Sequence, residues 1–262
     1  MRDVVEKSGL NRRRWLSGAF AVAGSAFVAA CDSVTHNPVV QQALRMAHGL
    51  TYRAQRLILP REALAPEYAE HEISPDFKPN GSTNPMASDY VALRDGGFAD
   101  YRLEVGGLVE RPLSLSLAEL RARPSRTQIT KHDCVEGWTS IGKWTGAKLS
   151  AILEEAGLRP EAKYIVFYCY DALNQQEDGP RYYESIDLVD AFHPQTILAY
   201  DMNDQVLPVP HGAPLRLRVE RQIGYKHAKY IRRIEAVESF DHIEGGNGGY
   251  WPDRGYQWYA GI

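Results

Sequence analysis

The chain has little cysteine, no excess of basic charge and no long apolar run. Of its 262 residues three are Cys, and 30 Lys and Arg stand against 33 Asp and Glu, a formal net charge of −3. The basic residues are scattered, so the sequence gives no electrostatic footprint for nucleic acid. With 44% hydrophobic and 24% charged residues, the composition is that of an ordinary globular protein, long enough to bury a substantial core.

Several ligand-binding motifs are missing as well. The sequence contains neither GxGxxG nor GxxxxGK followed by Ser or Thr, so the fingerprints of dinucleotide and nucleoside triphosphate binding are absent. It has no HExxH and no CxxC among its eight His and three Cys, which argues against a zinc site. Because CxxCH is absent too, we expect no c-type haem on this chain.

The first 30 residues are predicted to be an export signal that precedes the globular part. The segment NRRRWL at 11–16 resembles the twin-arginine signal, which exports folded proteins. The apolar run at 18–30 is too short to span a bilayer. It ends in Val-Ala-Ala-Cys, which resembles the lipobox in which Cys31 becomes the lipid-bearing N-terminus. We expect a periplasmic protein or membrane-anchored lipoprotein; a membrane-anchoring helix and a plain cleaved signal are the alternatives.

Composition divides the remaining chain near residue 97. Residues 31–97 contain six prolines, which leave little room for long regular elements. We therefore expect a linker and an N-terminal arm there, with one helix at 39–50. No internal repeat or low-complexity segment is present.

Residues 98–262 are predicted to form one α+β domain. The expected strands and helices follow one another without a regular βαβ rhythm, which argues against a doubly wound sheet. Ser116 followed by Glu119 matches a capping box that begins a short helix, and Gly106-Gly107 is expected to turn the chain. We expect strands at 101–105, 111–117, 163–171, 181–186, 196–201, 214–220 and 229–239, and further helices at 150–158 and 187–192.

The segment KHDCVEGWTSIGKW at 131–144 surrounds Cys134 with a histidine, acidic residues and tryptophans. Cys169 lies in an apolar strand and is expected to behave as a small hydrophobe, although a Cys134–Cys169 disulfide is an alternative. A thiol nucleophile would need His132 as its base, on the same face of an extended segment. The remaining choice is soft thiolate ligation of a metal that belongs to an external cofactor.

A second segment, 211–231, gathers hydrogen-bond donors. A His-Gly-x-Pro sequence begins at His211, Arg216 follows on the expected strand, and Lys229 comes thirteen residues later. Guanidinium binds phosphate or polar ring edges in a fork, and Lys supplies a point charge. Each residue alone is more often part of a solvated face, but together they suit an anionic, heteroatom-rich ligand.

The two segments together resemble the sulfite-oxidase-type molybdenum enzymes, which bind a single molybdopterin. Cys-Val-Glu-Gly-Trp at 134–138 looks like the ligand motif of that family, and the resemblance spans about 98–240. A cofactor inserted before export also agrees with the twin-arginine resemblance. The residues that fall on the family's pterin-binding pattern are His211, Gly212, Pro214, Arg216 and Lys229.

This resemblance implies roles for residues of the site. Cys134 would bind molybdenum and act as a catalytic residue, and Tyr256 is the candidate for the family's active-site tyrosine. The backbone of 224–229 would close around the phosphate of the pterin. The residues expected at the molybdenum-molybdopterin cofactor are Asn80, His132, Cys134, His211, Arg216, Gly224, Lys226 and Lys229.

The resemblance also implies a type of reaction. We expect oxygen-atom transfer to or from a small oxyanion or a sulfoxide, with electrons exchanged through a separate protein, a cytochrome or a membrane haem subunit. We expect no immunoglobulin-like dimerisation domain of the kind that animal and plant sulfite oxidases have, and the chain looks closer to bacterial catalytic subunits. His211 is typical of the sulfite oxidase side of the family. A non-catalytic lipoprotein with a degenerate cofactor domain is the alternative.

Overall fold

The computed structural model describes residues 38–173 and 179–262, so the expected leader and Cys31 lie outside the described residues. The chain forms two compact units, 1–54 and 55–262. Helix α2 (Pro38–Ile58) is longer than the predicted helix at 39–50, and its last residues belong to the second unit. Within the described residues, no helix combines the length and apolar character needed to cross a membrane.

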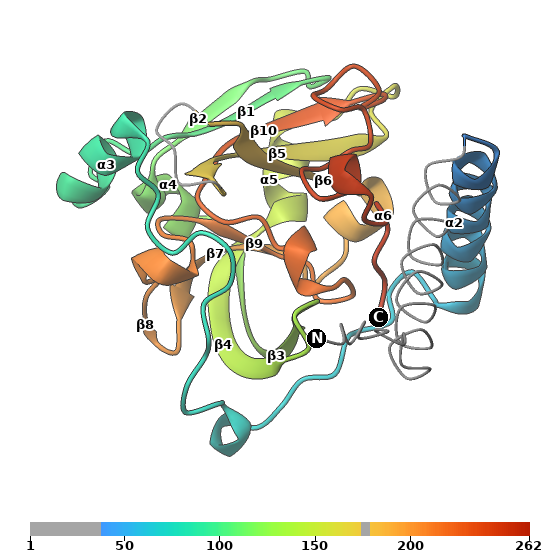
Figure 1. The fold of residues 1–262 in the computed structure, drawn as a ribbon. Helices are drawn as coiled ribbons and strands as arrows, with labels where there is room; N and C mark the ends of the chain where they lie inside the picture. The colour runs from blue at the N-terminus through green and yellow to red at the C-terminus, as the bar shows by residue number, and fades with distance from the viewer. Residues whose placement is uncertain (1–37, 174–178) are drawn as a thin grey trace, which may run out of the picture. The chain divides into compact units, whose positions relative to one another are not determined.

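The second unit is α+β, as predicted, and contains two five-stranded sheets (Figure 1). In the first sheet β1 and β10 pair in parallel, and the other neighbours pair antiparallel. Its strands, in spatial order, are β2 (Leu113–Leu115), β1 (Leu103–Gly107), β10 (Ile231–Val237), β5 (Tyr164–Ala172) and β6 (Arg181–Asp187).

The second sheet is antiparallel throughout and begins with a long hairpin. The hairpin pairs β3 (Ser125–Asp133) with β4 (Thr139–Lys148), and β4 pairs with β7 (Ile197–Met202). The short strands β8 (Gln205–Val206) and β9 (Arg216–Arg218) both pair with β7.

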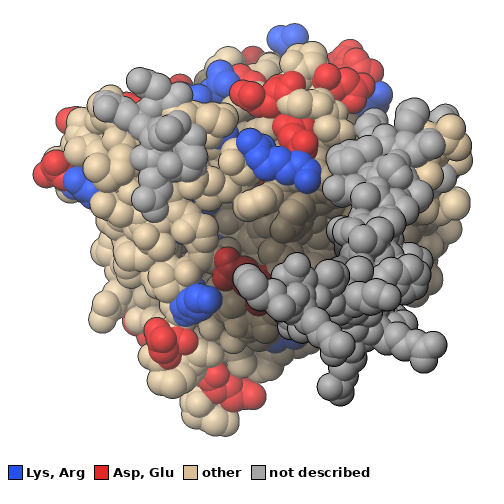
Figure 2. Space-filling model, viewed as in Figure 1, with Lys and Arg blue, Asp and Glu red and all other residues tan. Residues whose placement is uncertain are grey.

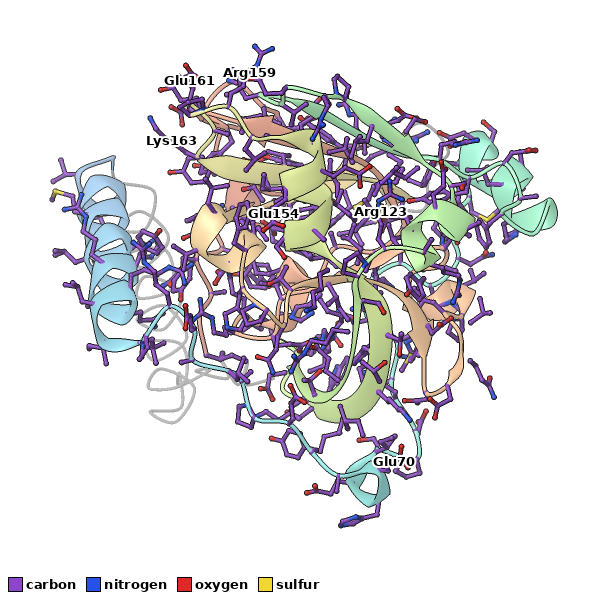
Figure 3. All side chains as sticks on the ribbon, turned by 180° about the vertical axis from the view of Figure 1, so that it is seen from behind. Glu70, Arg123, Glu154, Arg159, Glu161 and Lys163 are labelled. Atoms are coloured by element: carbon purple, nitrogen blue, oxygen red, sulfur yellow. The ribbon has the colours of Figure 1, made fainter. Side chains whose placement is uncertain are left out.

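The main core lies between the sheets, around α5 (Leu149–Ala156). Leu149, Ile152 and Leu153 of α5 are buried and belong to one cluster with Phe167 of the first sheet and Leu198 of the second. Figures 1 and 3 show α5 between the two sheets, and Figure 3 labels Glu154 on this helix. The two sheets are therefore held by one shared apolar core.

Shorter elements complete the unit. The remaining helices are α3 (Ser88–Asp95), α4 (Leu117–Arg121) and α6 (Leu188–Ala191), and the 3₁₀ turns are η1 (Glu70–Glu72), η2 (Val209–His211), η3 (Gly224–Lys226) and η4 (Pro252–Arg254). Figure 3 labels Glu70 in η1, at the lower end of the view. Lys143 of β4 binds both Glu70 and Asp204.

Some local predictions are confirmed and others are wrong. The capping box at Ser116 and Glu119 begins α4, and Gly157 follows α5 with φ +68°. Gly106 and Gly107 lie inside β1, so the turn expected there is wrong. The arm contains α3, which was not predicted. Strands β3 and β4 were also missed, because the inward side chains of β3 are polar and give no apolar alternation: Gln128, Thr130 and His132 are 1–2% exposed.

Charged side chains are unevenly placed on the surface. On the face drawn in Figure 2, Lys, Arg, Asp and Glu gather along the upper edge and again at the lower left, while the hollowed middle is mostly uncharged. Both signs are mixed at that edge. This face shows no continuous basic stripe.

Candidate active site

The loop between β3 and β4 is a tight turn that carries Cys134. The Cys134 N–H donates to the carbonyl of Trp138, and the Gly137 N–H donates to the carbonyl of Cys134, each at 3.0 Å. Gly137 has φ +85°, which glycine adopts without strain. The thiol of Cys134 is free and half-buried, and burial raises its pKa. The turn thus presents a thiol that stays protonated at neutral pH unless a bound cation favours the thiolate.

His132 lies two residues earlier, on the inward side of β3, and is 1% exposed. The Arg218 guanidinium donates to its Nδ1 at 3.0 Å, so the neutral ring carries its proton on Nε2, an atom without a partner. Burial, together with His227 and Arg218, holds the pKa of His132 well below its usual range. Gly224 allows this packing, because a Cβ there would lie 2.7 Å from Nε2.

Arg216 lies in the interior, in contact with the His-Gly-x-Pro loop. It is 1% exposed, and its Nη1 donates to the carbonyl of His211 at 2.9 Å. The guanidinium carbon lies 4.8 Å from the ring centroid of Trp144. Its Nε and Nη2 have no partner. Burial, and then the neighbouring Arg218, lowers the pKa of Arg216 to about 9.

The loop itself has little space around its backbone. Gly212 has φ +114°, and a Cβ at this position would lie 2.9 Å from the Cβ of Lys229 and 3.2 Å from that of Arg216. Glycine is therefore needed on both grounds. The ring of His211 is partly buried, and its Nδ1 has no partner. Burial, followed by Arg216 and Lys229, lowers the pKa of His211 to about 4.

Lys229 binds the arm. Its ammonium donates to the carbonyls of Asn80 at 2.6 Å and of Pro210 at 3.0 Å, and also to the carbonyl of Ser82. Burial, and then Arg216, lowers the pKa of Lys229 to about 7. All three protons of the ammonium thus form hydrogen bonds. Asn80 contacts Lys229 through the backbone carbonyl of Asn80 and not through its side chain. The expected contacts of both residues with a cofactor stay predictions.

Lys226 and Tyr256 lie in different surroundings. The side chain of Lys226 is fully buried, pairs with Glu184 and donates to the carbonyl of Ser185 at 2.8 Å. Its backbone N–H donates to the carbonyl of Ile223 at 2.9 Å, so the predicted phosphate contact of Lys226 stays a prediction. Tyr256 is 40% exposed, and its ring lies 5.3 Å from that of Tyr225, in the aromatic C-terminal segment. The assignment of Tyr256 as the active-site tyrosine stays a prediction.

Six of the buried polar atoms without partners lie where the hairpin and the loop meet. A ring contact at 5.0 Å between His132 and His227, and the stacking of Arg216 on Trp144, join several of these residues. Buried polar groups normally have partners, so such a cluster fits a heteroatom-rich ligand that would supply them. The unpartnered atoms are His132 Nε2, Trp144 Nε1, His211 Nδ1, Arg216 Nε and Nη2, and His227 Nδ1.

Two members of this cluster were not predicted. Trp144 is fully buried on β4, the strand that the sequence did not reveal. His227 donates from Nε2 to the carbonyl of Gln222 at 3.0 Å, and its Nδ1 is the unpartnered atom. His227 lies inside the segment 224–229 that was expected to close around the phosphate, so a search of that segment for side chains would have found it.

The thiol-enzyme alternative is not favoured by this geometry. A nucleophilic cysteine needs a lowered pKa or an adjacent base, but burial raises the pKa of Cys134. His132 uses its Nδ1 to accept from Arg218. Cys169, the partner in the alternative disulfide, is a free, fully buried thiol in the core, as a small hydrophobe would be.

A cavity of about 290 Å³ lies against the other side of β3. Lys131 and Asp133 line it from the strand, and Glu220 and Arg221 line it from the segment after β9. Apolar side chains, including Leu59, form the rest of its wall. Thr130, an inward residue of β3, lines this surface pocket as well.

Comparison with known proteins identifies the family. The model of the oxidoreductase molybdopterin-binding domain matches residues 91–242. This chain belongs to that family. It is therefore a molybdopterin-dependent oxidoreductase, and the match contains both the Cys134 hairpin and the His211 loop.

Three relatives are reductases or reductase subunits by name. A putative protein-methionine-sulfoxide reductase subunit, YedZ1, of Azospira oryzae is 36% identical over 250 residues, 95% of this chain and 87% of the relative. The protein-methionine-sulfoxide reductase catalytic subunit MsrP of Xanthomonas axonopodis pv. citri is 38% identical over 53% of this chain and 45% of its own length. MsrP of Campylobacter jejuni is 33% identical over 52% and 48%.

The share of each relative that this chain covers differs among the matches. The chain spans most of the Azospira relative but about half the length of the MsrP proteins. Among solved structures, the sulfane dehydrogenase SoxCD of Paracoccus pantotrophus matches with a TM-score of 0.48 and 27% identity, over 53% of this chain and 39% of that one.

Proposed function

We propose that the protein is an exported molybdenum-cofactor oxidoreductase that reduces a sulfoxide, with electrons supplied by a separate protein. The observation that carries this proposal is the cluster of unpartnered buried donors around Arg216, next to a half-buried free thiol at Cys134. The family match supports the cofactor, and the names of the Azospira and Xanthomonas relatives support the substrate class.

The residues present fit this cofactor. Cys134 would bind the molybdenum, and metal binding would remove the proton that burial otherwise retains on the thiol. Arg216 offers two free N–H groups in a fork, the geometry that suits a phosphate or a polar ring edge. Because Gly212 and Gly224 have no Cβ, the backbone at these positions lies close to Lys229 and to His132. When bound, the cofactor would supply the metal centre for oxygen-atom transfer.

Export and electron delivery belong to the same proposal. The twin-arginine resemblance at 11–16 supports export of a folded, loaded protein, and the sequence ending at Cys31 supports a lipid anchor. Reduction of a sulfoxide consumes two electrons and two protons and releases water, so an electron donor is required. We infer a cytochrome or a membrane haem subunit as that donor, since the sequence has no CxxCH of its own.

One observation favours a second candidate, sulfite oxidation. His211 is the residue typical of the sulfite oxidase side of the family, and in this structure it carries an unpartnered Nδ1. The two candidates run in opposite directions. Sulfite oxidation releases two electrons and takes its oxygen from water.

The test is to purify the exported protein, measure molybdenum per chain, and assay both reactions with artificial dyes. Methionine sulfoxide should oxidise a reduced dye, and sulfite should leave an oxidised dye unchanged. Absence of molybdenum would defeat the cofactor assignment. Turnover of sulfite with none of methionine sulfoxide would transfer the proposal to the second candidate.

A further inference from the structure

Phe77 joins the two halves of the candidate site, although it lies in an irregular part of the arm. It is 7% exposed, whereas both of its neighbours in sequence, Asp76 and Lys78, are exposed. Its ring centroid lies 5.4 to 6.4 Å from those of four other rings. Three belong to the Cys134 hairpin and one to the loop before Arg216: His132, Trp138, Trp144 and His211.

The arm is fixed on both sides of Phe77. Before it, the Ser74 N–H donates to the carbonyl of Ile141 at 3.0 Å, and the Ile141 N–H donates to the Ser74 hydroxyl at 2.9 Å. After it, Lys229 binds the carbonyls of Asn80 and Ser82. The first attachment is to β4 and the second to the segment before β10, so this part of the arm spans both halves of the site.

The hairpin has a space for this ring. Gly142 of β4 faces Phe77, and a Cβ on Gly142 would lie 3.1 Å from two carbons of the ring. Phe77 also belongs to a small apolar cluster with Trp144 and with Ile197 and Ala199 of β7. A phenyl ring surrounded in this way has one well-defined position.

Three of the four rings that Phe77 contacts carry unpartnered polar atoms. These are His132 Nε2, Trp144 Nε1 and His211 Nδ1. Phe77 has no polar atom with which to satisfy them. Its contacts therefore fix where these groups lie and leave their hydrogen-bonding capacity free for a ligand.

We propose that Phe77 is a positioning residue that fixes the Cys134 hairpin relative to the His211 loop. The effect of Phe77 on the cofactor rests on the proposed function, because a bound cofactor would contact both the Cys134 hairpin and the His211 loop, whose separation Phe77 sets. The ring acts through His132, Trp144 and His211, which it contacts in both halves of the site. Its removal would leave a cavity into which these three rings can shift.

The experiment compares Phe77→Ala with Phe77→Leu, which keeps most of the space filled. Phe240→Ala is the matched control, since Phe240 packs on Tyr164 and Trp258, outside the candidate site. The first readout needs no cofactor. Amide hydrogen exchange of the cofactor-free protein should quicken roughly tenfold or more in both 138–144 and 209–213 for Phe77→Ala. It should change by much less for Phe77→Leu and not at all there for Phe240→Ala.

The second readout is the electron paramagnetic resonance spectrum of Mo(V), normalised to molybdenum content. The proposal expects shifted g-values in Phe77→Ala, restored in Phe77→Leu, because the geometry at Cys134 changes. Lower molybdenum content with an unchanged spectrum, together with unchanged exchange at 209–213, would show a merely structural role and overturn the proposal. If the wild type holds no molybdenum, the proposed function fails, and the exchange result alone then decides for or against Phe77.

Discussion

Arg216 and Lys226 are both cations removed from water, yet their surroundings are opposite. Lys226 is 0% exposed and meets a carboxylate, Glu184, and a carbonyl. Arg216 is 1% exposed, meets a single carbonyl, and keeps two donor nitrogens without a partner. A buried charge without a counter-charge destabilises a fold. The protein supplies hydrogen-bond partners to Lys226, which holds two segments together. It leaves two donor nitrogens of Arg216 without partners, and a ligand would supply these.

The same difference extends to the neighbours of each cation. Arg218, two residues after Arg216, is paired with Glu220 at 2.6 Å and bound to His132. The Arg218 pair thus belongs with the Lys226 pair, because in each the protein supplies a carboxylate to the buried cation. We call Cys134, His211 and Arg216 the open region, and the Glu184–Lys226 and Arg218–Glu220 pairs the closed region.

The largest expected effect is on catalysis, from the open region. Cys134→Ala should abolish turnover and the thiolate-to-metal absorption, because the variant lacks the atom that binds molybdenum. The midpoint of unfolding of the cofactor-free protein should change little, since the thiol is only half-buried. Steady-state assays, visible absorption and thermal unfolding measure the three quantities.

Cys169→Ala is the matched control for this prediction. Cys169 is fully buried in the core, so its replacement should lower stability by about 1 kcal/mol through a small cavity and leave the specific activity per molybdenum intact. Residual turnover in Cys134→Ala would contradict the assignment of the metal ligand.

The closed region should respond in stability. Lys226→Met leaves Glu184 buried without its cation, and breaking such a pair usually costs about 3–5 kcal/mol. We expect about 3 kcal/mol, the low end of that range, because burial already raises the pKa of Glu184 to about 7 and the carboxyl can take up a proton. Equilibrium unfolding in denaturant measures this change.

An exposed ion pair supplies the control. Lys163 and Glu238 are paired at 3.0 Å with 59% and 60% of their side chains exposed, so Lys163→Met should change stability by roughly 0–1 kcal/mol. An equal loss in Lys163→Met and Lys226→Met would remove the distinction between a buried and a surface pair.

Arg216 and Arg218 allow the sharpest contrast, because they share a strand and a face. Arg216→Met should leave the cofactor-free protein as stable as before, or more stable, since an unpaired buried charge is removed. It should weaken cofactor binding by about tenfold or more, the equivalent of one or two charged hydrogen bonds. Arg218→Met should instead destabilise the cofactor-free protein, because Glu220 and His132 lose their partner.

Fluorescence of extracted molybdopterin and unfolding of the cofactor-free protein together test this pair. Arg121→Met serves as the remote control, as Arg121 binds Asp201 at the surface. If both Arg216→Met and Arg218→Met destabilise the cofactor-free protein equally, Arg216 belongs to the closed region and the comparison fails.

The sequence predicted the fold class and the family better than the construction of the candidate site. The α+β class, the segment around Cys134 and the buried role of Cys169 follow from local patterns, as does the capping box at Ser116. Strand β3 did not, because its inward residues are polar and bind distant groups: Gln128 donates to Glu220, 92 residues away. No local pattern contains such a partnership.

In the arm, contacts between residues far apart in the sequence were even harder to predict. Proline spacing predicted an irregular segment there, but not that Phe77 would be buried among four rings. Lys229 meets the carbonyls of Asn80 and Ser82 across 149 and 147 residues. A carbonyl has no side-chain signature, so the ligands of this lysine are invisible in the sequence.

The smallest expected effect is a difference in pH dependence between the two regions. His211 has its pKa lowered to about 4 from an ordinary 6.5, so between these values the unfolded chain binds a proton that the folded chain does not. Its contribution to stability is complete above pH 6.5 and is lost as the pH falls toward 4. Glu184 has its pKa raised to about 7 from 4.5, so its contribution has the opposite sign and is lost as the pH rises through that window.

Two variants separate these contributions in the cofactor-free protein. His211→Asn should reduce the loss of stability between pH 6.5 and pH 4, although His132 and His227, whose pKa values are lowered in the same direction, keep part of it. Glu184→Gln should instead reduce the loss between pH 4.5 and pH 7. Denaturant midpoints at pH 4.5, 6 and 7.5 measure both.

With the cofactor bound, its negative charge beside His211 should raise the pKa of that imidazole and make the loss of stability on the acid side shallower, while the pH dependence due to Glu184 should stay as it was. Identical slopes for loaded and cofactor-free protein would place His211 outside the reach of the cofactor, and the open region would then shrink to Cys134 and Arg216.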